Sequence, residues 1–271
     1  MATTAIKRNL APTYQANPSW FTKTKLFTIE ILVKEFFAIC KYVYYSIRYF
    51  CDPHQYNLDR PTPLQKQSAK IILLVHGQGA APATFLPLAQ KLQAVGLAVY
   101  TVKYESTEDN PLPTAVLIER IKELAKEHPF EEVELIGHSL GGSMAARLAF
   151  MENQGGLNDL GIKISKVISI AGRLLFIPDA WSWYCPKLEG ELKILMQDYA
   201  RNNEQAELFT ISGVKDALIP TRSVHIGLQK NQQYMAPNRR HFETVFATEV
   251  HTQVLMQTLR WGSIAALTKA Q

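Results

Sequence analysis

The sequence has few features of secreted, metal-binding or nucleic-acid-binding proteins. It contains three cysteines in 271 residues, and their spacing fits neither a disulfide framework nor a zinc motif. The polar residues 1–25 include two prolines and lack the apolar stretch of a secretory signal. We therefore expect a reducing compartment, with the protein cytoplasmic or peripheral at a membrane.

Excess charge is confined to the N-terminal segment. Residues 1–50 carry seven basic and two acidic side chains, which accounts for the formal net charge of +5. The remainder carries as many acidic as basic side chains. This balance argues against a nucleic-acid-binding face on the main domain and for an anionic partner of the N-terminal segment.

Residues 26–50 predict one long helix, because they contain neither proline nor glycine. Glu30, Lys34, Lys41 and Arg48 fall on one narrow stripe, and most of the remaining surface is apolar and aromatic. Three interpretations are open: the helix packs on the main domain, lies in a membrane interface, or spans a bilayer. Spanning is disfavoured, because each charge near its middle would cost about 2.5–3.5 kcal/mol.

After a proline-containing linker at residues 51–69, short apolar runs alternate with helical patterns. The apolar runs predict six strands, at residues 71–75, 98–102, 133–136, 167–171, 208–212 and 244–248. Helices are predicted at residues 83–96, 113–128 and 252–261. This alternation predicts an α/β domain with a mostly parallel sheet flanked by helices over residues 66–271, preceded by an N-terminal extension, residues 1–65.

The alternation breaks between residues 173 and 205. The first part is aromatic and loop-like, and a helical pattern follows at residues 191–199. Because this segment follows the strand after residues 133–136, it is placed to cover a site as a lid. The side chains expected to contact substrate from it are Phe176, Trp181, Trp183 and Tyr184.

The most informative stretch is Gly137-His138-Ser139-Leu140-Gly141, which joins an apolar strand to a helix. It matches Gly-x-Ser-x-Gly, the nucleophile elbow. A serine on so sharp a turn needs glycine two positions to either side, because larger side chains would collide. The turn presents the Ser139 hydroxyl at the amino end of a helix, where developing negative charge is favoured.

A serine nucleophile needs a base and a carboxylate that orients the base, and both are expected after later strands of the sheet. Asp216 lies on the turn after strand 208–212 and is the predicted acid. His251 follows the predicted last strand, 244–248, and is the predicted base. His241 precedes that strand, so we expect it at the opposite edge of the sheet.

Two backbone N–H groups are expected to hold the oxyanion of the tetrahedral intermediate. Leu140 supplies one, because it follows the serine. Gln78 supplies the other from the loop His76-Gly77-Gln78-Gly79, whose glycines let the backbone approach substrate. We interpret His76 as a support for this loop rather than a catalytic group.

With these motifs the chain resembles the α/β-hydrolase superfamily, and within it the compact bacterial lipases and esterases. The resemblance is carried by the loop 76–79, the elbow 137–141, the turn 216–220 and His251. It covers about residues 70–265 and leaves out the first 65. The two antiparallel strands that commonly open this fold are not evident before the first predicted strand.

The expected function is a serine hydrolase that cleaves carboxylic esters through an acyl-enzyme, with no metal and no other cofactor. Lipid esters are the favoured substrates, since the aromatic segment 176–184 and the basic, aromatic helix 26–50 suit an acyl chain at an interface. The same triad would serve an acyltransferase, a thioesterase or an amidase, and a non-catalytic binding protein is the alternative from another class. The expected partners are a small-molecule or lipid ester and, through residues 26–50, a membrane surface.

Overall fold

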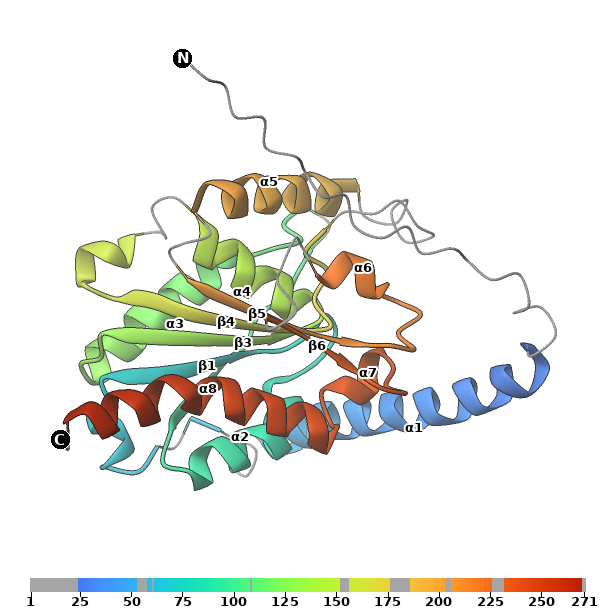
Figure 1. The fold of residues 1–271 in the computed structure, drawn as a ribbon, viewed down its shortest axis with the longest axis horizontal. Coiled ribbons are helices and arrows are strands. Elements are labelled where there is room, and N and C mark those ends of the chain that lie inside the picture. Colours follow the sequence, from blue (N-terminus) through green and yellow to red (C-terminus); the bar gives the residue numbers. More distant parts are fainter. Residues whose placement is uncertain are drawn as a thin grey trace, which may run out of the picture.

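A single six-stranded sheet lies between two layers of helices in the computed structural model (Figure 1). The structure describes residues 24–52, 58–59, 61–107, 109–151, 156–175, 186–202, 206–225 and 232–269. The N-terminal helix α1 spans Thr24–Cys51, and its side chains are described from Val33 onward, apart from Lys34. Those of the C-terminal helix α8, Thr248–Lys269, are described through Leu259.

All six strands run parallel, in the order β2-β1-β3-β4-β5-β6. Their bounds are β1 Lys70–Val75, β2 Ala98–Val102, β3 Glu132–His138, β4 Lys163–Ile170, β5 Glu207–Gly213 and β6 Gln233–Ala236. The inner strands are buried on both faces, which explains their continuous apolar runs. The parallel arrangement brings the carboxyl ends of all six strands to one edge of the sheet.

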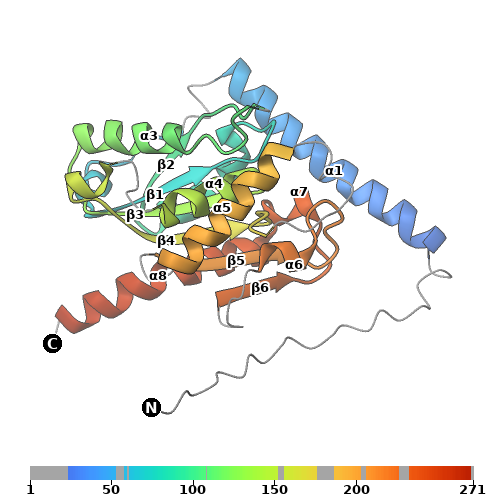
Figure 2. The same ribbon diagram turned by 90° about the horizontal axis from the view of Figure 1, so that it is seen from above.

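Helices cover both faces of the sheet (Figure 1), and Figure 2 looks down on the face that α4 and α5 cover. One face packs against α3, α4 and α5 through side chains such as Leu117, Met144 and Leu195. The other packs against α2 and α8 through Leu88 and Val254. The bounds are α2 Leu86–Ala94, α3 Thr114–Glu127, α4 Leu140–Phe150, α5 Pro186–Asn202, α6 Thr221–Val224 and α7 His241–Thr244, with short 3₁₀ turns η2 Gln65–Gln67, η3 Pro82–Phe85 and η5 Asn158–Leu160.

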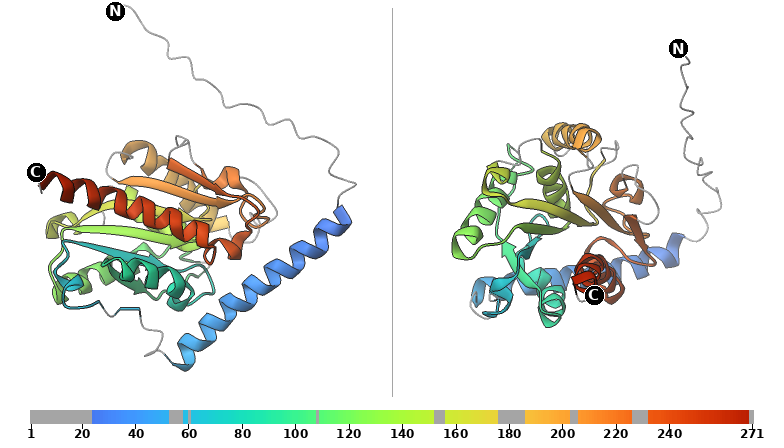
Figure 3. Two further views of the ribbon diagram at one scale, coloured as in Figure 1. Left: turned by 60° about the horizontal axis from the view of Figure 1, so that its bottom comes forward. Right: turned by 60° about the vertical axis from the view of Figure 1, so that its left-hand side comes forward.

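Helix α1 packs across the edge of the sheet where the strands end (Figure 3). It contacts η3, which follows β1, and α7, which follows β6. Ala38 and Tyr42 are buried in this contact, whereas Phe36 and Phe37 on the outward side are 61% and 66% exposed. The helix therefore packs on the main domain and also presents an apolar outer face. Within the described residues, no helix combines the length and the apolar character needed to cross a bilayer.

Five of the six predicted strands are confirmed, and the sixth is wrong. Residues 244–248 form the end of α7, a turn and the start of α8, while the sixth strand is β6. Among the described residues β6 pairs only with β5, and three of its four side chains are at least partly exposed, so it shows no apolar run. The apolar Val245 and Ala247 are buried because they pack under the turn between α7 and α8, not because they form a strand.

The segment expected as a lid is described only in part. Residues 176–185, with Phe176, Trp181, Trp183 and Tyr184, lie outside the described residues. The helical pattern at 191–199 is confirmed as part of α5, which packs on α4 through Leu192 and Leu195. Arg147 of α4 also pairs with Asp198 of α5.

Candidate active site

Ser139 stands at the apex of the turn between β3 and α4. Its backbone has φ 53° and ψ −125°, a strained conformation for any residue except glycine. The conformation is held by a hydrogen bond of 2.8 Å from the Ser139 N–H to the carbonyl oxygen of Ile170. A Cβ at Gly137 would overlap the backbone of Gly141, and one at Gly141 would overlap the carbonyl oxygen of Val75. The turn therefore requires both glycines of the motif.

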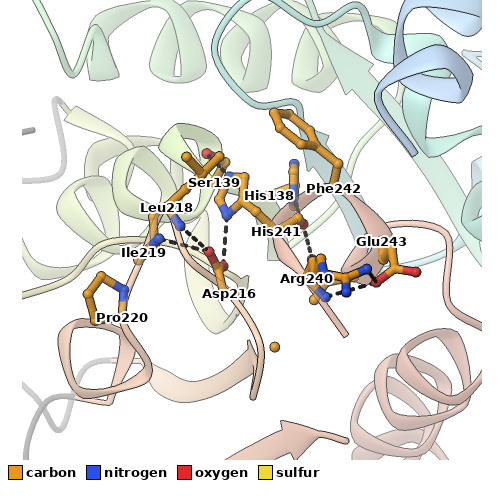
Figure 4. A network of polar contacts seen from close by, with 12 residues as sticks. His138, Ser139, Asp216, Leu218, Ile219, Pro220, Arg240, His241, Phe242 and Glu243 are labelled. Carbon is orange, nitrogen blue, oxygen red and sulfur yellow. Dashed lines mark hydrogen bonds and ion pairs between the residues drawn. The ribbon is translucent and has the colours of Figure 1, made fainter. Parts of the chain in front are cut away.

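A chain of hydrogen bonds links Ser139 to His241 and His241 to Asp216 (Figure 4). His241 Nε2 lies 2.8 Å from Ser139 Oγ, and His241 Nδ1 lies 2.9 Å from Asp216 Oδ2. Since the carboxylate can only accept, Nδ1 carries the proton and Nε2 is free to accept the proton of the serine hydroxyl. This is the relation between nucleophile, base and orienting acid that acyl transfer requires.

Asp216 lies on the turn that leaves β5, as expected from the sequence. Its side chain has 0% exposure. Oδ1 accepts the N–H groups of Leu218 at 2.9 Å and Ile219 at 2.8 Å, and Oδ2 faces His241. The turn therefore fixes the carboxylate so that one oxygen is left for the histidine.

His251, the base predicted from the sequence, does not reach Ser139, so this prediction is wrong. It is buried in the first turns of α8, where its Nε2–H donates to the carbonyl oxygen of Val245 at 2.8 Å. Burial lowers the pKa of His251. The expectation that the base follows the last strand was sound, but the last strand is β6, and the histidine that follows it is His241.

The short helix α7 is fixed by contacts around the His241 carbonyl group. This oxygen accepts a hydrogen bond from His138 Nε2 at 3.1 Å and another from Thr244 Oγ1 at 2.6 Å. The side chain of Glu243 accepts the N–H of Arg240 at 3.1 Å, which caps the start of the helix. Burial lowers the pKa of His138 to about 3, so His138 is a neutral donor. The histidine inside the elbow motif thus supports the base.

The loop after β1, residues 76–79, is the predicted oxyanion loop. The His76 ring stacks on Tyr104 with 4.4 Å between centroids, and its Nδ1–H donates to the Gly77 carbonyl oxygen at 2.8 Å. Burial lowers the pKa of His76 to about 4, which fits a structural support. Gly79 has φ 68°, and Gln78 is exposed. A cavity of about 410 Å³ adjoins this loop, and its wall also includes Phe50, Lys103, Tyr104, Glu105 and Ser106.

Comparison with known proteins places the likeness in the first half of the main domain. A family model described as a thioesterase domain matches residues 70–165. This span runs from β1 into β4 and includes the loop 76–79 and Ser139, but it ends before Asp216 and His241. No curated protein matches the sequence.

Several solved structures are similar at low sequence identity. A carboxylesterase of Nitrososphaera gargenis is 14% identical, with 78% of this chain and 99% of that chain covered and a TM-score of 0.46. The type II thioesterase BorB from the borrelidin biosynthetic cluster is 16% identical, with 74% and 94% covered and a TM-score of 0.45. A predicted hydrolase from Thermoplasma acidophilum is 18% identical, with 73% and 88% covered and a TM-score of 0.46. Likeness at this level does not transfer an activity.

The order of the parallel strands, the strained serine and the hydrogen-bonded Ser-His-Asp chain are those of the α/β-hydrolase fold. The family match over residues 70–165 supports a hydrolase of the esterase or thioesterase type. In the part of the chain that the structure describes, no cluster of three or more His, Cys, Asp or Glu side chains could hold a metal ion.

Proposed function

We propose that the protein is a serine hydrolase that cleaves carboxylic esters or thioesters through an acyl-enzyme. Ser139 attacks the acyl carbon while His241 removes its proton and then protonates the leaving group. Asp216 orients His241 and favours the imidazolium form. The backbone N–H groups of Gln78 and Leu140 hold the oxyanion, and water then releases the acyl group by the same route. No metal or other cofactor takes part.

The proposal rests on one observation, the continuous hydrogen-bond chain from Ser139 through His241 to Asp216. A serine hydroxyl is a weak nucleophile unless a base takes its proton. Both hydrogen bonds fall in the range that proton transfer needs before substrate arrives. A binding protein on this scaffold would have no need to keep all three groups in contact.

The favoured substrates are acyl esters of lipids, with thioesters as the second candidate. The family match to residues 70–165 favours the thioester, whereas the apolar outer face of α1 favours substrates at a lipid interface. p-Nitrophenyl esters from acetate to palmitate and an acyl N-acetylcysteamine thioester, assayed with wild type and Ser139→Ala, test both classes. We expect turnover that rises with chain length and is absent from the variant.

Equal turnover by Ser139→Ala would refute the serine mechanism. Faster hydrolysis of acetate than of long-chain esters would refute the lipid preference and leave the mechanism intact. Adding glycerol or another alcohol and analysing the products by mass spectrometry separates hydrolysis from acyl transfer, since a transferase would form the new ester.

The outer face of α1 suits peripheral contact with an anionic membrane, and we include this contact in the proposal. Phe36, Phe37 and Ile47 are 61%, 66% and 55% exposed on this helix. The cations Lys41 and Arg48 are also on exposed parts of it, and residues 1–23 add three basic and no acidic side chains. Apolar side chains bordered by cations bind the interface of anionic bilayers.

A cytoplasmic location and the division into residues 1–65 and 66–271 stay predictions.

The exposed Cys40, which lies among these side chains, offers a direct test. With Cys51 and Cys185 replaced by serine, Cys40 is labelled with a polarity-sensitive maleimide dye. Vesicles of phosphatidylglycerol should shift its emission to the blue, whereas vesicles of phosphatidylcholine alone should shift it less. Phe37→Ser together with Ile47→Ser should abolish the shift, and Leu160→Ser, an exposed apolar position outside α1, serves as the matched control. No shift with anionic vesicles would remove membrane contact from the proposal.

A further inference from the structure

The inner face of α1 touches the predicted oxyanion loop and α7, the two elements that complete the candidate active site. Tyr42 lies on this face and is 6% exposed. Its ring packs edge-on against Phe242 of α7, with 5.1 Å between centroids and an interplanar angle of 68°. It also lies 6.2 Å from the ring of His138, which supports the base. Tyr42 of α1 therefore lies against Phe242, the residue after His241, and near His138, which donates to the His241 carbonyl oxygen (Figure 4 shows His138 and Phe242).

The Tyr42 hydroxyl reaches the oxyanion loop. A Cβ built on Gly77 would lie 2.8 Å from this oxygen, 3.1 Å from Ser139 Cβ and 3.2 Å from His138 Nδ1. The three groups thus converge on the same side of Gly77, and a larger residue there would require these side chains to shift. Burial raises the pKa of Tyr42, so its hydroxyl stays neutral. Tyr42 consequently packs between the oxyanion loop and the element that carries the base.

Glu35 stands about two helical turns before Tyr42 and faces the same site. Its Oε1 accepts the backbone N–H of Phe242, the residue after His241, at 3.4 Å. Its Oε2 is buried without a hydrogen-bond partner. A half-satisfied buried carboxylate is costly unless a positive charge comes near it. The imidazolium of His241, which forms during the reaction, is such a charge.

The charges around Glu35 fit this role. The groups that act on it electrostatically are His241, Asp216 and Glu243. Burial raises the pKa of Glu35, while the Phe242 N–H and His241 lower it. Protonated His241 and ionised Glu35 therefore favour each other, whereas the two other carboxylates oppose the ionisation of Glu35. At a partly buried position such an interaction is stronger than at the surface.

We propose that Glu35 and Tyr42, both supplied by α1, are positioning residues for the reaction: Tyr42 fixes α7 against the oxyanion loop, and Glu35 favours the imidazolium of His241. This inference rests on the proposed mechanism through Ser139 and His241. It assigns α1 a part in turnover that is separate from its outer face. An anchor that merely adheres to the domain would not place a carboxylate beside the base.

The test compares Glu35→Gln and Tyr42→Phe with Tyr44→Phe in the full chain, using a soluble p-nitrophenyl ester without lipid. Tyr44 is on the same helix but 52% exposed, so it is the matched control for Tyr42. All rates are divided by active sites titrated with a fluorophosphonate, which removes any effect of unfolded protein. Glu35→Gln should lower kcat about tenfold, the equivalent of roughly 1.4 kcal/mol, with KM changed little. Tyr42→Phe should lower kcat about threefold, and Tyr44→Phe should not.

The pH profile separates electrostatic positioning from simple structural support. The neutral glutamine no longer favours protonated His241, so the acidic half-point of kcat/KM should move to lower pH by about half a unit or more in Glu35→Gln. Glu35→Asp, which keeps the charge, should restore the wild-type half-point. If Ser139→Ala is inactive while Glu35→Gln matches wild type in both kcat and half-point, the inference is wrong and the mechanism stands. Activity of Ser139→Ala would instead overturn the mechanism on which the inference rests.

Discussion

Two buried histidines lie ten residues apart, in the first turns of the consecutive helices α7 and α8, and only one of them belongs to the candidate active site. His241, in α7, contacts Ser139 and Asp216 through its two nitrogens. His251, in α8, is 1% exposed, and its Nε2–H donates a hydrogen bond to the carbonyl oxygen of Val245. Burial and position after Asp216 in the sequence do not distinguish them. What distinguishes them is that α7 begins after the short turn that leaves the carboxyl end of β6, whereas α8 comes later and packs on the face of the sheet.

The largest effect we expect is on kcat, when each of these two histidines is replaced by alanine in turn. His241→Ala should lower kcat by roughly 10⁴-fold to 10⁶-fold, because the nucleophile loses its base. His251→Ala should keep kcat within about threefold of wild type per titrated site, because its side chain contacts neither substrate nor triad. Steady-state assays of a p-nitrophenyl ester decide the matter, and a severe loss in His251→Ala alone would reverse the assignment.

Asp216 sharpens the comparison, because it contacts only one of the two histidines. Asp216→Asn should lower kcat by about 10⁴-fold, since an amide can no longer impose the tautomer that leaves His241 Nε2 unprotonated. The Leu218 and Ile219 N–H groups should still find the remaining carbonyl oxygen, so the fold should persist. Circular dichroism is the control, and wild-type turnover in a folded Asp216→Asn variant would remove Asp216 from the triad.

For the free energy of unfolding we expect the opposite order, with His251 contributing more than His241. His251→Ala removes a buried hydrogen bond and leaves a cavity beside the α8 packing face, so it should lower the free energy of unfolding by about 1–3 kcal/mol. Urea unfolding followed by tryptophan fluorescence gives this value. His251→Gln retains a donor and should recover part of the loss. A His251→Ala variant as stable as wild type would show that the contact with Val245 contributes nothing.

Stability should also depend on pH. Burial lowers the pKa of His251, that of His76 to about 4 and that of His138 to about 3. An unfolded histidine titrates near 6.5, so below that pH the unfolded chain binds more protons than the native one. Their contribution to stability is therefore complete above about pH 6.5 and declines as the pH falls toward 4. Urea midpoints at pH 7.5 and 5.0 should differ accordingly, and His251→Ala should reduce the difference; an unchanged difference would contradict this account of His251.

The sequence predicts the inner part of this fold well, because burial on both faces gives β1, β3, β4 and β5 continuous apolar runs. The elbow is equally predictable, since steric demand leaves no choice at Gly137 and Gly141. Asp216 follows from its place after β5. These features are decided locally, by a few residues whose chemistry permits one arrangement.

The base could not be assigned in the same way. β6 is an edge strand with one partner, so Gln233–Ala236 lacks an apolar run, while the apolar residues of 244–248 imitate one. Tertiary packing overrides propensity at both places. Chain order does not decide between the two histidines either, because both His241 and His251 follow Asp216.

The sequence also does not show which face of α1 packs against the domain. The charged stripe pointed to one polar side, yet Glu35, outside that stripe, faces the domain with Tyr42. A helix that is apolar almost all round does not reveal which side it buries. Only the contact with α7 decides it.

Labelling by a fluorophosphonate, with wild type, Ser139→Ala, His241→Ala and His251→Ala side by side, tests the central claim most directly. The probe reacts with a serine only when a base activates it. We expect wild type and His251→Ala to be labelled at similar rates, and Ser139→Ala and His241→Ala to remain unlabelled. Labelling of folded His241→Ala at the wild-type rate, or loss of labelling in folded His251→Ala, would contradict a triad of Ser139, His241 and Asp216.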